Sequence, residues 1–400
     1  MPFFLTKKNV EEKRLGIYIH IPFCKSKCEY CDFYSVGGRI EESMTDRYLQ
    51  ALADHMKETG KLAPGYTVDT VYFGGGTPSY FGADNLERIL DEVHRNFRLS
   101  VDAEITLEAN PESLNSQMLH KLIRAGFNRL SIGVQSDDDE MLTKLGRVHN
   151  FHQAKLAMQQ ARKAGFGNIS LDLMYGLPGQ TLAQWRDTVT NIVSMRPDHI
   201  SCYALKLEEN TPMFGYRDKL TFPDDDKQAD MYLAACEILR DFGYRHYEIS
   251  NFAKKGRESR HNMKYWNGGE YLGFGPSAAS DFAGKRFTIC RDLHGYIDGI
   301  AKKEAILTEC ESIPLRERAG EYIMLRLRTL DGVNAEEYER NFLMPFGQIE
   351  QLMQRFADNG FAEKENENWR LTEKGWLVSN RIIVAINELQ ERSTPLAKKR

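Results

Sequence analysis

The stretch LGIYIHIPFCKSKCEYCDF, residues 15–33, joins an apolar, β-branched run to a segment that holds three of the seven cysteines in the chain. The run GIYIHI predicts a β-strand, and the polar residues between the cysteines predict that a loop follows it. Cys24, Cys28 and Cys31 have the spacing C-x3-C-x2-C, so three thiolates can meet within one loop. Thiolates are soft ligands, which bind zinc, copper(I) or iron–sulfur clusters in preference to hard cations. The stretch therefore predicts a metal centre at the end of a strand.

Two kinds of metal centre fit three closely spaced cysteines. A structural zinc ion takes four ligands, usually as two separated pairs, and the sequence contains no second pair of closely spaced cysteines. Zinc would therefore need His20 or a distant residue as its fourth ligand. A cubic 4Fe-4S cluster held by three thiolates would keep one iron open, where a substrate can bind the metal. We favour the cluster, with zinc as the alternative.

Composition places the chain among globular proteins and argues against a nucleic-acid partner. It has 400 residues, 42% of them hydrophobic, with a net charge of -4 and a pI near 6.2. A nucleic-acid binder normally shows a basic excess over a whole domain, because its affinity comes largely from neutralising phosphates. We therefore expect no nucleic-acid partner.

The N-terminal residues contain no apolar run typical of a signal peptide, and no segment reaches the apolar length of a membrane span. We therefore expect a cytoplasmic protein, in which disulfides are rare and clustered cysteines bind metals or catalyse. The scattered Cys202, Cys236, Cys290 and Cys310 are predicted to be small core residues rather than ligands.

Between Leu15 and about Leu207, short apolar runs alternate with helical patterns, as in the βα repeat of a parallel sheet. The runs are mostly apolar because a parallel strand is covered on both faces. Gly126 and Gly165 follow two of the helical patterns, where a left-handed C-cap is favoured. The acidic clusters at 137–139 and 224–226 are predicted at helix starts. The six predicted strands are GIYIHI (16–21), TVYFGG (70–75), EITLEAN (104–110), RLSIGVQS (129–136), ISLDLMYG (169–176) and HISCYAL (199–205).

Six such units predict an α/β fold with a partial (β/α)6 barrel, and the rest of the chain divides by composition. We expect an N-terminal tail over 1–14, the barrel over 15–250, a glycine-rich, aromatic connecting segment over 251–310, and a small winged-helix-like domain over 311–400. The final AKKR is a basic tail that is expected to be solvated, with contact to acidic lipid at the membrane periphery or to a partner as the weaker alternative.

Polar residues and glycines follow consecutive strands of the predicted barrel. The loop GGGTPS, 74–79, follows the second strand, Glu108 and Gln135 end the third and fourth, and Asp172 lies within the fifth. In a β/α barrel the chemistry collects at the carboxyl ends of the strands. A buried carboxylate such as Asp172 also needs a partner. The pattern predicts a ligand pocket at this end, next to the cysteine loop.

The spacing C-x3-C-x2-C with Tyr30 just before the last cysteine resembles the signature of the radical S-adenosylmethionine (SAM) superfamily. The resemblance implies a 4Fe-4S cluster on Cys24, Cys28 and Cys31. Its open iron would chelate SAM and pass it one electron, cleaving it to methionine and a 5'-deoxyadenosyl radical. A reductant protein such as flavodoxin is implied as the electron donor.

The same resemblance implies which other residues contact SAM. The residues that match superfamily positions are Gly75, Gly76 and Thr77 in the methionine-binding stretch, Glu108, Gln135, Arg147 and Asp172 at the strand ends and beyond, and Tyr18 and Tyr30 near the cysteines.

The segments LDLMYGLPGQT (171–181) and ALKLEENTP (204–212) and the C-terminal region look like the oxygen-independent coproporphyrinogen III oxidase family, over nearly the whole chain. That family implies two branches. One is a dehydrogenase that decarboxylates coproporphyrinogen III during haem synthesis. The other is a haem-chaperone branch that binds haem and delivers it to client proteins such as respiratory enzymes.

Three features favour the chaperone branch. The dehydrogenase carries a fourth cysteine where this chain has Phe33. It also has a long N-terminal extension, whereas only 23 residues precede Cys24 here. The third feature is a match to the H-N-x-x-Y-W motif of the haem-binding branch, by His261, Asn262, Tyr265 and Trp266.

We therefore expect a haem-binding radical SAM protein that cleaves SAM without coproporphyrinogen dehydrogenase activity, with the dehydrogenase as the alternative. A histidine can ligate haem iron, and tyrosine and tryptophan offer flat apolar area for a porphyrin. The alternative for His261 is a hydrogen-bonded structural histidine.

Overall fold

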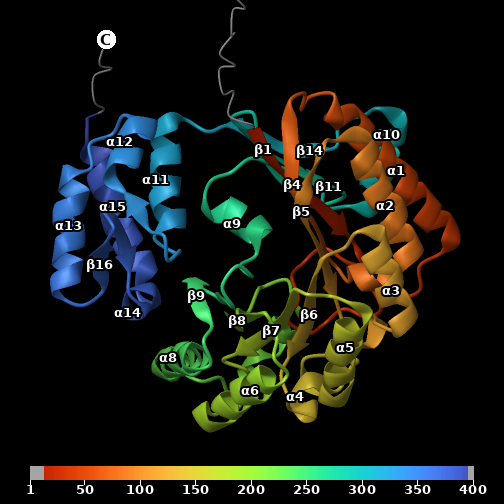
Figure 1. Ribbon diagram of the computed structural model, residues 1–400, viewed down its shortest axis with the longest axis horizontal. Helices are drawn as coiled ribbons and strands as arrows, with labels where there is room; N and C mark the ends of the chain where they lie inside the picture. Colours follow the sequence, from red (N-terminus) through yellow and green to blue (C-terminus); the bar gives the residue numbers. More distant parts are fainter. Residues whose placement is uncertain (1–12, 395–400) are drawn as a thin grey trace, which may run out of the picture.

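Six parallel strands form the middle of a twelve-stranded sheet in the computed structural model, which describes residues 13–394 (Figure 1). Each is hydrogen-bonded in parallel to the next, in chain order. The predicted partial (β/α)6 barrel is therefore confirmed. The six strands are β1 (Lys13–Ile21), β4 (Tyr66–Gly75), β5 (Leu99–Ala109), β6 (Arg129–Gln135), β7 (Ile169–Tyr175) and β8 (His199–Ala204).

Helices on the outer face connect these strands. In α2, the stripe of Leu86, Ile89, Leu90 and Val93 is buried, as its helical spacing predicts. Parallel strands need a crossover of this length to return to the same end of the sheet. The crossover helices are α1 (Glu42–Gly60), α2 (Ala83–Asn96), α3 (Ser116–Ala125), α4 (Asp139–Lys144), α5 (Phe151–Ala164) and α6 (Leu182–Ser194).

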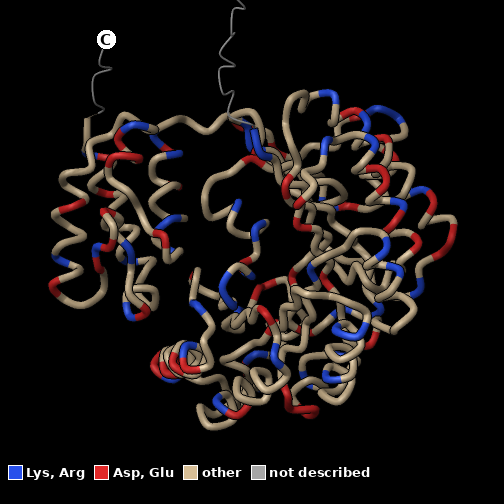
Figure 2. The backbone as a smooth tube through the Cα atoms, viewed as in Figure 1, with Lys and Arg blue, Asp and Glu red and all other residues tan. Residues whose placement is uncertain are grey.

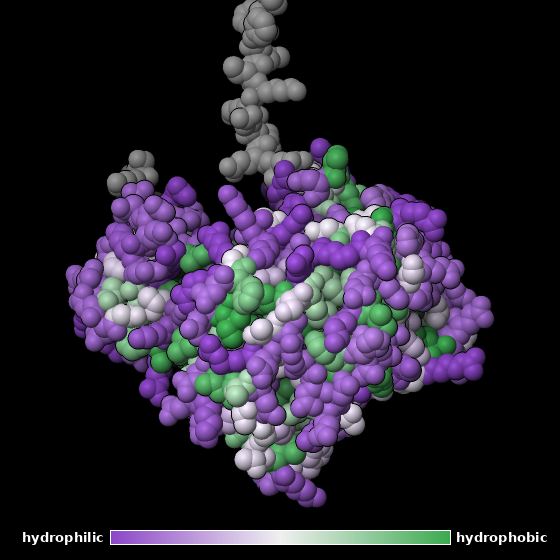
Figure 3. All heavy atoms as spheres, turned by 60° about the horizontal axis from the view of Figure 1, so that its bottom comes forward, coloured by the Kyte–Doolittle hydropathy of each residue, from purple (hydrophilic) through white to green (hydrophobic). Residues whose placement is uncertain are grey.

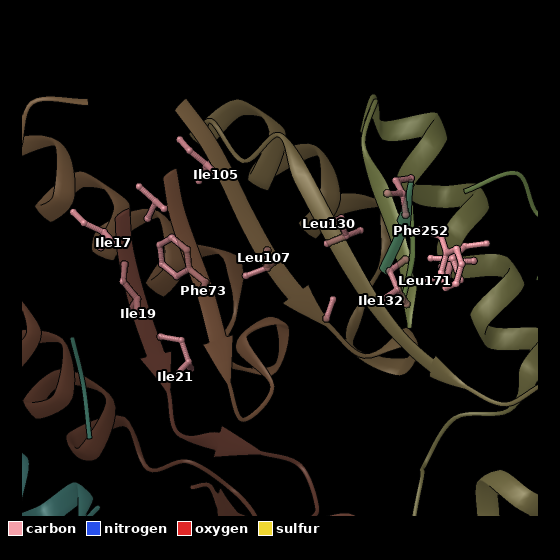
Figure 4. Close-up of a cluster of buried hydrophobic side chains, with 14 of the residues drawn as sticks. Ile17, Ile19, Ile21, Phe73, Ile105, Leu107, Leu130, Ile132, Leu171 and Phe252 are labelled. Atoms are coloured by element: carbon pink, nitrogen blue, oxygen red, sulfur yellow. The ribbon is translucent and has the colours of Figure 1, made fainter. Parts of the chain in front are cut away.

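Apolar side chains on the strands form one continuous core with these helices (Figure 4). Ile17, Ile19 and Ile21 alternate along β1 and are fully buried, next to Phe73 on β4. Each such side chain contributes about 1.5–3 kcal/mol when it is removed from water. The core therefore holds the strand ends, and the loops that leave them, in fixed positions.

The predicted helix ends are also found. Gly126 and Gly165 are left-handed C-caps, with φ of 110° and 108°, after α3 and α5. Asp138 is the N-cap of α4 and accepts two backbone N–H groups, and Asp224 is the N-cap of α8 (Asp225–Asp241) and accepts one, that of Lys227. Helix ends can be predicted locally because each capping residue lies within one turn of the unpaired backbone groups to which it hydrogen-bonds.

The sheet extends beyond the six strands on both edges. On one edge β11 pairs in parallel with β1, and β12 to β14 follow antiparallel; on the other, β10 pairs antiparallel with β8 and β9. The added strands are β9 (Arg245–Glu248), β10 (Asn251–Ala253), β11 (Tyr271–Phe274), β12 (Ala279–Phe282), β13 (Lys285–Ile289) and β14 (Leu307–Ser312).

Most of these added strands lie in the segment that the sequence predicts to be a connection. They are only three to six residues long, so alternation gives little signal. At Gly273 on β11, a Cβ atom would lie 2.3 Å from the carbonyl oxygen of Ala279, so the close pairing with β12 requires glycine. Helices α9 (Arg260–Trp266) and α10 (Leu293–Lys302) flank these strands.

A separate group of helices with a three-stranded antiparallel sheet follows, in the order β15-β17-β16. This arrangement agrees with the winged-helix-like domain predicted there. Trp369 and Trp376 are buried in its core. Its elements are α11 (Leu315–Arg326), β15 (Val333–Asn334), α12 (Ala335–Phe342), α13 (Gly347–Asp358), β16 (Ala362–Glu365), β17 (Asn368–Leu371), α14 (Glu373–Leu377) and α15 (Ser379–Arg392).

The C-terminal domain is attached to the barrel through β9 and α8. Backbone hydrogen bonds run from Ile249 N to Arg328 O and from Leu330 N to Tyr247 O, each 2.9 Å long. The Trp376 indole donates to the carbonyl of Leu327 over 2.8 Å, which fixes α14 against α11. α9 lies between the two parts of the chain in Figure 1.

Charged side chains of both signs are interspersed along the chain (Figure 2). The face in Figure 3 is mostly hydrophilic, with apolar residues gathered near its centre. No helix within residues 13–394 has the length and apolarity to cross a bilayer. Most of the predicted N-terminal tail, and the basic AKKR end, lie outside the described residues.

Candidate functional site

A cavity of about 340 Å³ opens at the carboxyl ends of the parallel strands. The cysteine loop forms one wall, and residues from β4 to β8 form the floor. Most of the residues predicted to bind the cluster and SAM line it together. They are Cys24, Cys28, Tyr30, Cys31, Gly75, Gly76, Thr77, Glu108, Gln135, Arg147 and Asp172, and Asn262 of the predicted haem motif joins them.

The cysteine loop is tied at its base. The short strand β2 (Phe23–Cys24) pairs in parallel with β3 (Val36–Gly37), so the two ends of the loop lie side by side. Within it, Cys31 N donates to Cys28 O over 3.3 Å, and Glu29 N donates to Leu145 O over 3.1 Å. These bonds gather the three thiols on one side of the cavity.

The thiols themselves are partly shielded from water. Burial raises the pKa of Cys24 and, to about 11, that of Cys31, and neighbouring thiols of the loop add to both shifts. The hydroxyl of Thr77 lies 3.4 Å from Cys24 Sγ and opposes the shift. Thiols of this kind lose their protons when they bind a metal, because the metal cation takes the place of the protons on the sulfur atoms.

The spacing of the sulfurs distinguishes the two metal centres. Among the described residues, the three Sγ atoms of the loop do not all lie within 4.8 Å of one another. A single tetrahedral zinc ion holds its sulfur ligands about 3.8 Å apart, given Zn–S bonds of about 2.3 Å. The loop as it stands therefore does not bring the three sulfurs as close together as a single zinc ion requires.

Arg147 links the cysteine loop to the strand ends. Its guanidinium donates to Cys28 Sγ over 3.6 Å, and to Asn110 Oδ1 and Gly133 O over 2.7 Å each. Burial opposes the charge, but the nearby Tyr30 and Cys28 raise the pKa of Arg147, so the group stays a cation. This cation lies beside thiols that would carry negative charge as metal ligands, and it balances them.

The glycine loop after β4 packs directly on the base of the cysteine loop. Gly76 N and Thr77 N donate to the carbonyls of Ile21 and Phe23, each over 2.8 Å. A Cβ atom on Gly76 would lie 2.8 Å from both of these oxygens, so only glycine allows this contact. The backbone N–H groups therefore hold the cysteine loop, and the hydroxyl of Thr77 is placed on Cys24.

Two carboxylates lie on the cavity floor. Glu108 accepts hydrogen bonds from the Tyr72 hydroxyl over 2.7 Å and from Gly75 N over 3.2 Å. Burial raises the pKa of Glu108 to about 7, and Asp172 adds to the shift. Glu108 therefore changes its charge near neutral pH.

Asp172 is the second carboxylate and has the partners that a buried carboxylate needs. It accepts from the hydroxyls of Ser131, Ser170 and Ser201, the last over 2.7 Å. Burial raises its pKa, and the serine hydroxyls and nearby Arg129 oppose the shift. Both carboxylates face the cavity, where they can accept bonds from the hydroxyl or ammonium groups of a ligand.

Gln135 has a strained backbone at the end of β6. Its φ is 68°, and the register between β6 and β7 shifts between Gly133 and Gln135. Left-handed conformations of residues other than glycine cost about 1–3 kcal/mol and gather at functional sites. The shift turns Gln135 toward the cavity, as its predicted role requires.

Tyr30 and Tyr18 occupy different places. Tyr30 lines the cavity near Arg147, and burial raises its pKa. Tyr18 lies behind the cavity: its ring stacks on Tyr72 with centroids 6.2 Å apart, and its hydroxyl is 3.1 Å from His20 Nδ1. Tyr18 therefore supports the pair of Tyr72 and Glu108 from outside the cavity lining.

The predicted haem motif forms α9, and its four residues point to different surroundings. His261 is fully buried: Nδ1 lies 2.9 Å from Thr70 Oγ1 and Nε2 lies 2.8 Å from the Tyr265 hydroxyl. Burial lowers the pKa of His261 to about 3, so the ring is neutral. In this conformation His261 is a hydrogen-bonded structural histidine, and it reaches a haem iron only if one of these bonds breaks. Trp266, the last residue of α9, is half-buried.

A second cavity, of about 410 Å³, lies on the other side of the cysteine loop. Phe33 is 69% exposed and lines both cavities, so it stands at their shared rim. The remaining walls of the second cavity are largely aromatic. They include Tyr18, His20, Tyr34, Tyr265 and Tyr271, together with Arg291.

Sequence reasoning missed several residues of the first cavity. Asn110 directly follows β5 and connects Arg147 to Thr77, and its position two residues after Glu108 was the available signal. Arg129 is 2% exposed, and its Nε has no hydrogen-bond partner among the described residues. Arg129 is the first residue of β6, and no sequence pattern predicts a ligand-binding residue at the start of a strand. An unpartnered buried donor in the cavity fits a ligand with a carboxylate, as SAM has.

Two family models match the chain: the Radical SAM superfamily over residues 18–192 and the HemN C-terminal domain over residues 313–378. A Bacillus subtilis (strain 168) protein described as heme chaperone HemW is 36% identical over 375 residues, covering 92% of this chain and 98% of that protein. The Escherichia coli (strain K12) protein of the same description is 34% identical over 380 residues, covering 92% and 97%.

Solved structures include one with the same architecture. The coproporphyrinogen III oxidase (HemN) of Escherichia coli, a radical SAM enzyme, superposes with a TM-score of 0.82 over 94% of this chain and 91% of that chain. The two are 24% identical, so the likeness shows a shared fold.

Proposed function

Because the chain belongs to the HemW family within the radical SAM superfamily, we propose that it is a haem chaperone, which binds haem and delivers it to haem proteins such as respiratory enzymes. The observation that carries this proposal is a similarity that runs through the barrel and the C-terminal domain alike, over 92% of the chain.

We propose that the first cavity holds a 4Fe-4S cluster on Cys24, Cys28 and Cys31, with SAM beside it. When bound, this pair would supply one-electron chemistry to the cavity. Arg147 balances the charge of the thiolates, and Thr77 donates to Cys24. The SAM contacts are assigned to Gly75, Gly76, Thr77, Glu108, Gln135, Arg147 and Asp172, all of which line the cavity, with Tyr30 beside them and Tyr18 behind Glu108.

The identity of residue 33 favours the assignment as a chaperone over the assignment as a dehydrogenase. The dehydrogenase branch has a cysteine at this position, and a phenyl ring offers neither a thiol nor a hydrogen-bonding group. Phe33 instead places an exposed apolar ring at the rim shared by the two cavities. An apolar ring here suits contact with a flat, apolar ligand.

We assign haem binding to the second cavity and to the motif of α9. Tyr265 lines this cavity, and so does Arg291, which donates to Asp32 Oδ1 over 3.1 Å and is a cation that can also pair with a propionate. His261 acts through Tyr265, since its Nε2 holds the phenol in place over 2.8 Å. Asn262 faces the first cavity, so the motif lies between the proposed sites for SAM and haem.

The partners belong to the same proposal. They are haem, a reductant protein such as flavodoxin, and haem-receiving client proteins in the cytoplasm.

An anaerobic experiment with cluster-reconstituted protein tests the function. Haem is titrated by its Soret band, and the loaded protein is mixed with an apo-haem protein. In parallel, SAM, a strong reductant and coproporphyrinogen III are added, and 5'-deoxyadenosine and tetrapyrroles are separated by chromatography. We expect saturable haem binding, transfer to the acceptor and no decarboxylated product. Accumulation of protoporphyrinogen with turnover would instead assign the chain to the dehydrogenase reaction.

A further inference from the structure

Three potential metal ligands outside the proposed haem and SAM sites meet where the C-terminal domain contacts the barrel. They are Cys236 on α8, His246 on β9 and Glu373, the first residue of α14. The thiol sulfur, a ring nitrogen and a carboxylate oxygen all lie within 4.8 Å of one another. The elements that carry them are neighbours in space (Figure 1). We propose that these three residues bind a zinc ion, which joins the C-terminal domain to the barrel.

The distance between the first two ligands has the value that zinc requires. Cys236 Sγ and His246 Nδ1 lie 3.6 Å apart. A tetrahedral zinc ion has Zn–S bonds of about 2.3 Å and Zn–N bonds of about 2.0–2.1 Å, which place sulfur and nitrogen about 3.6 Å apart. The separation of these two atoms is therefore the one that a shared zinc ion would set. The same distance also allows a weak hydrogen bond from the thiol to the ring nitrogen, which is the alternative that an experiment must exclude.

His246 is oriented as a metal ligand is. Its Nε2 lies 3.3 Å from the carbonyl oxygen of Ile249, so Nε2 carries the proton and Nδ1 keeps its lone pair toward Cys236. Histidines that bind metals usually donate their other N–H to such a carbonyl. The ring stacks on Phe252 with centroids 4.0 Å apart and meets the edge of Trp376 at 4.5 Å. Side chains from both domains therefore fix this ring.

Tyr232 supplies an independent observation. Its side chain is 5% exposed, and its hydroxyl has no hydrogen-bond partner among the described residues. Its ring packs against His246, with centroids 5.8 Å apart. A water molecule on the fourth position of the zinc ion would give the hydroxyl the partner that it lacks.

The ligand chemistry selects zinc over hard cations. A thiolate, an imidazole and a carboxylate form a mixed soft and borderline set, which magnesium and calcium do not favour. On binding, the Cys236 thiol releases its proton to solvent, so a dication meets one thiolate and one carboxylate and the site is neutral. Arg240 lies 3.4 Å from one oxygen of Glu373 and is largely exposed, so it can keep this contact.

Cys236 was predicted to be a small core residue, and its burial at 1% agrees with that prediction. Its partners are His246, which lies 10 residues away on β9, and Glu373 in the C-terminal domain. No short sequence motif therefore predicts the group. The zinc proposal is independent of the proposed haem function, and either can fail without the other.

The test uses the full chain with Cys24→Ala, Cys28→Ala and Cys31→Ala, so that the loop cannot bind the probe. Co²⁺ is titrated anaerobically, and thiolate-to-cobalt charge transfer is followed in the near ultraviolet. We expect saturation at one equivalent, with the band lost in Cys236→Ala and the affinity weakened about tenfold or more in Glu373→Gln. Cys290→Ala, which removes a different, partly buried cysteine, is the control and should bind as the parent does.

A second readout guards against misfolded variants. Glu373 is half-buried and glutamine has nearly the same size and shape, so Glu373→Gln should keep the circular dichroism spectrum of the parent. Zn²⁺ should raise the melting temperature of the parent and of Cys290→Ala, and leave that of Glu373→Gln unchanged. The proposal is overturned if the parent shows no charge-transfer band, or if Cys236→Ala keeps it.

Discussion

Arg147 and Cys28 are 119 residues apart in the chain, and the guanidinium of one donates to the sulfur of the other over 3.6 Å. The same guanidinium holds Asn110 and Gly133 at the strand ends. One half-buried cation therefore connects the cysteine loop to the floor of the cavity. It sets the electrostatic surroundings of any metal that the loop binds.

Arg147→Leu should make a cluster in this loop harder to reduce, because a nearby positive charge favours the added electron. At an effective dielectric constant of about 20, a unit charge some 5 Å away is worth about 3 kcal/mol, on the order of 100 mV. Potentiometric titration followed by electron paramagnetic resonance measures the shift. Arg355→Leu, on the exposed face of α13, should leave the potential unchanged; an equal potential in Arg147→Leu would contradict the role given to this residue.

Glu108 should make stability depend on pH. Its pKa is about 7 in the folded chain and lower when unfolded, so the folded state binds more protons between about pH 4.5 and 7. The stability that this protonation adds is fully present below about pH 4.5 and is lost as the pH rises through 7. Because Glu108 partly faces the cavity, we expect a change of about 2 kcal/mol.

Urea unfolding at a series of pH values measures this effect. Burial also raises the pKa of Glu248 to about 7, so the wild type carries two such groups. The informative quantity is the difference between wild type and Glu108→Gln, which should grow in favour of the variant from pH 5 to pH 8. Parallel curves for the two proteins would show that Glu108 does not titrate in this range.

Gly76→Ala should detach the glycine loop from the cysteine loop. The added methyl group would meet the carbonyl oxygens of Ile21 and Phe23 at 2.8 Å, and backbone on both sides leaves no flexible atom to yield. We expect a loss of about 1–3 kcal/mol in the free energy of unfolding and a lower iron content after reconstitution. Gly167→Ala is the control, since nothing lies within 4 Å of its added Cβ. Normal iron content in Gly76→Ala would argue against the packing described here.

The haem motif should respond to changes in two distinct ways. Tyr265→Phe removes the hydroxyl that faces His261. It should weaken haem binding, because Tyr265 lines the proposed haem cavity, while the fold loses only about 1 kcal/mol. His261→Ala leaves the hydroxyls of Thr70 and Tyr265 without this partner, so both stability and haem affinity should fall. Soret titration gives the affinity, and thermal unfolding gives the stability. Unchanged haem affinity in both variants would remove the motif from the haem site.

The barrel and the metal loop could be predicted from local sequence. Apolar runs separated by helical stripes predicted the six strands, and Gly126 and Gly165 predicted two helix ends, because each signal and its structural effect lie within a few residues. The loop of Cys24, Cys28 and Cys31 was predicted for the same reason. The strands β11 to β14 were not, since they are short and their pairing depends on an edge that the barrel must first provide.

By itself, then, the sequence determined the parallel core, the helix caps and the cysteine loop, because backbone preference and burial periodicity act over short stretches of chain. Only the tertiary structure decided that Arg147 reaches Cys28, that His261 is held by Thr70 and Tyr265, and that Cys236, His246 and Glu373 come together. The physical reason is that these contacts depend on how whole elements pack, and packing brings together side chains that no spacing in the sequence relates.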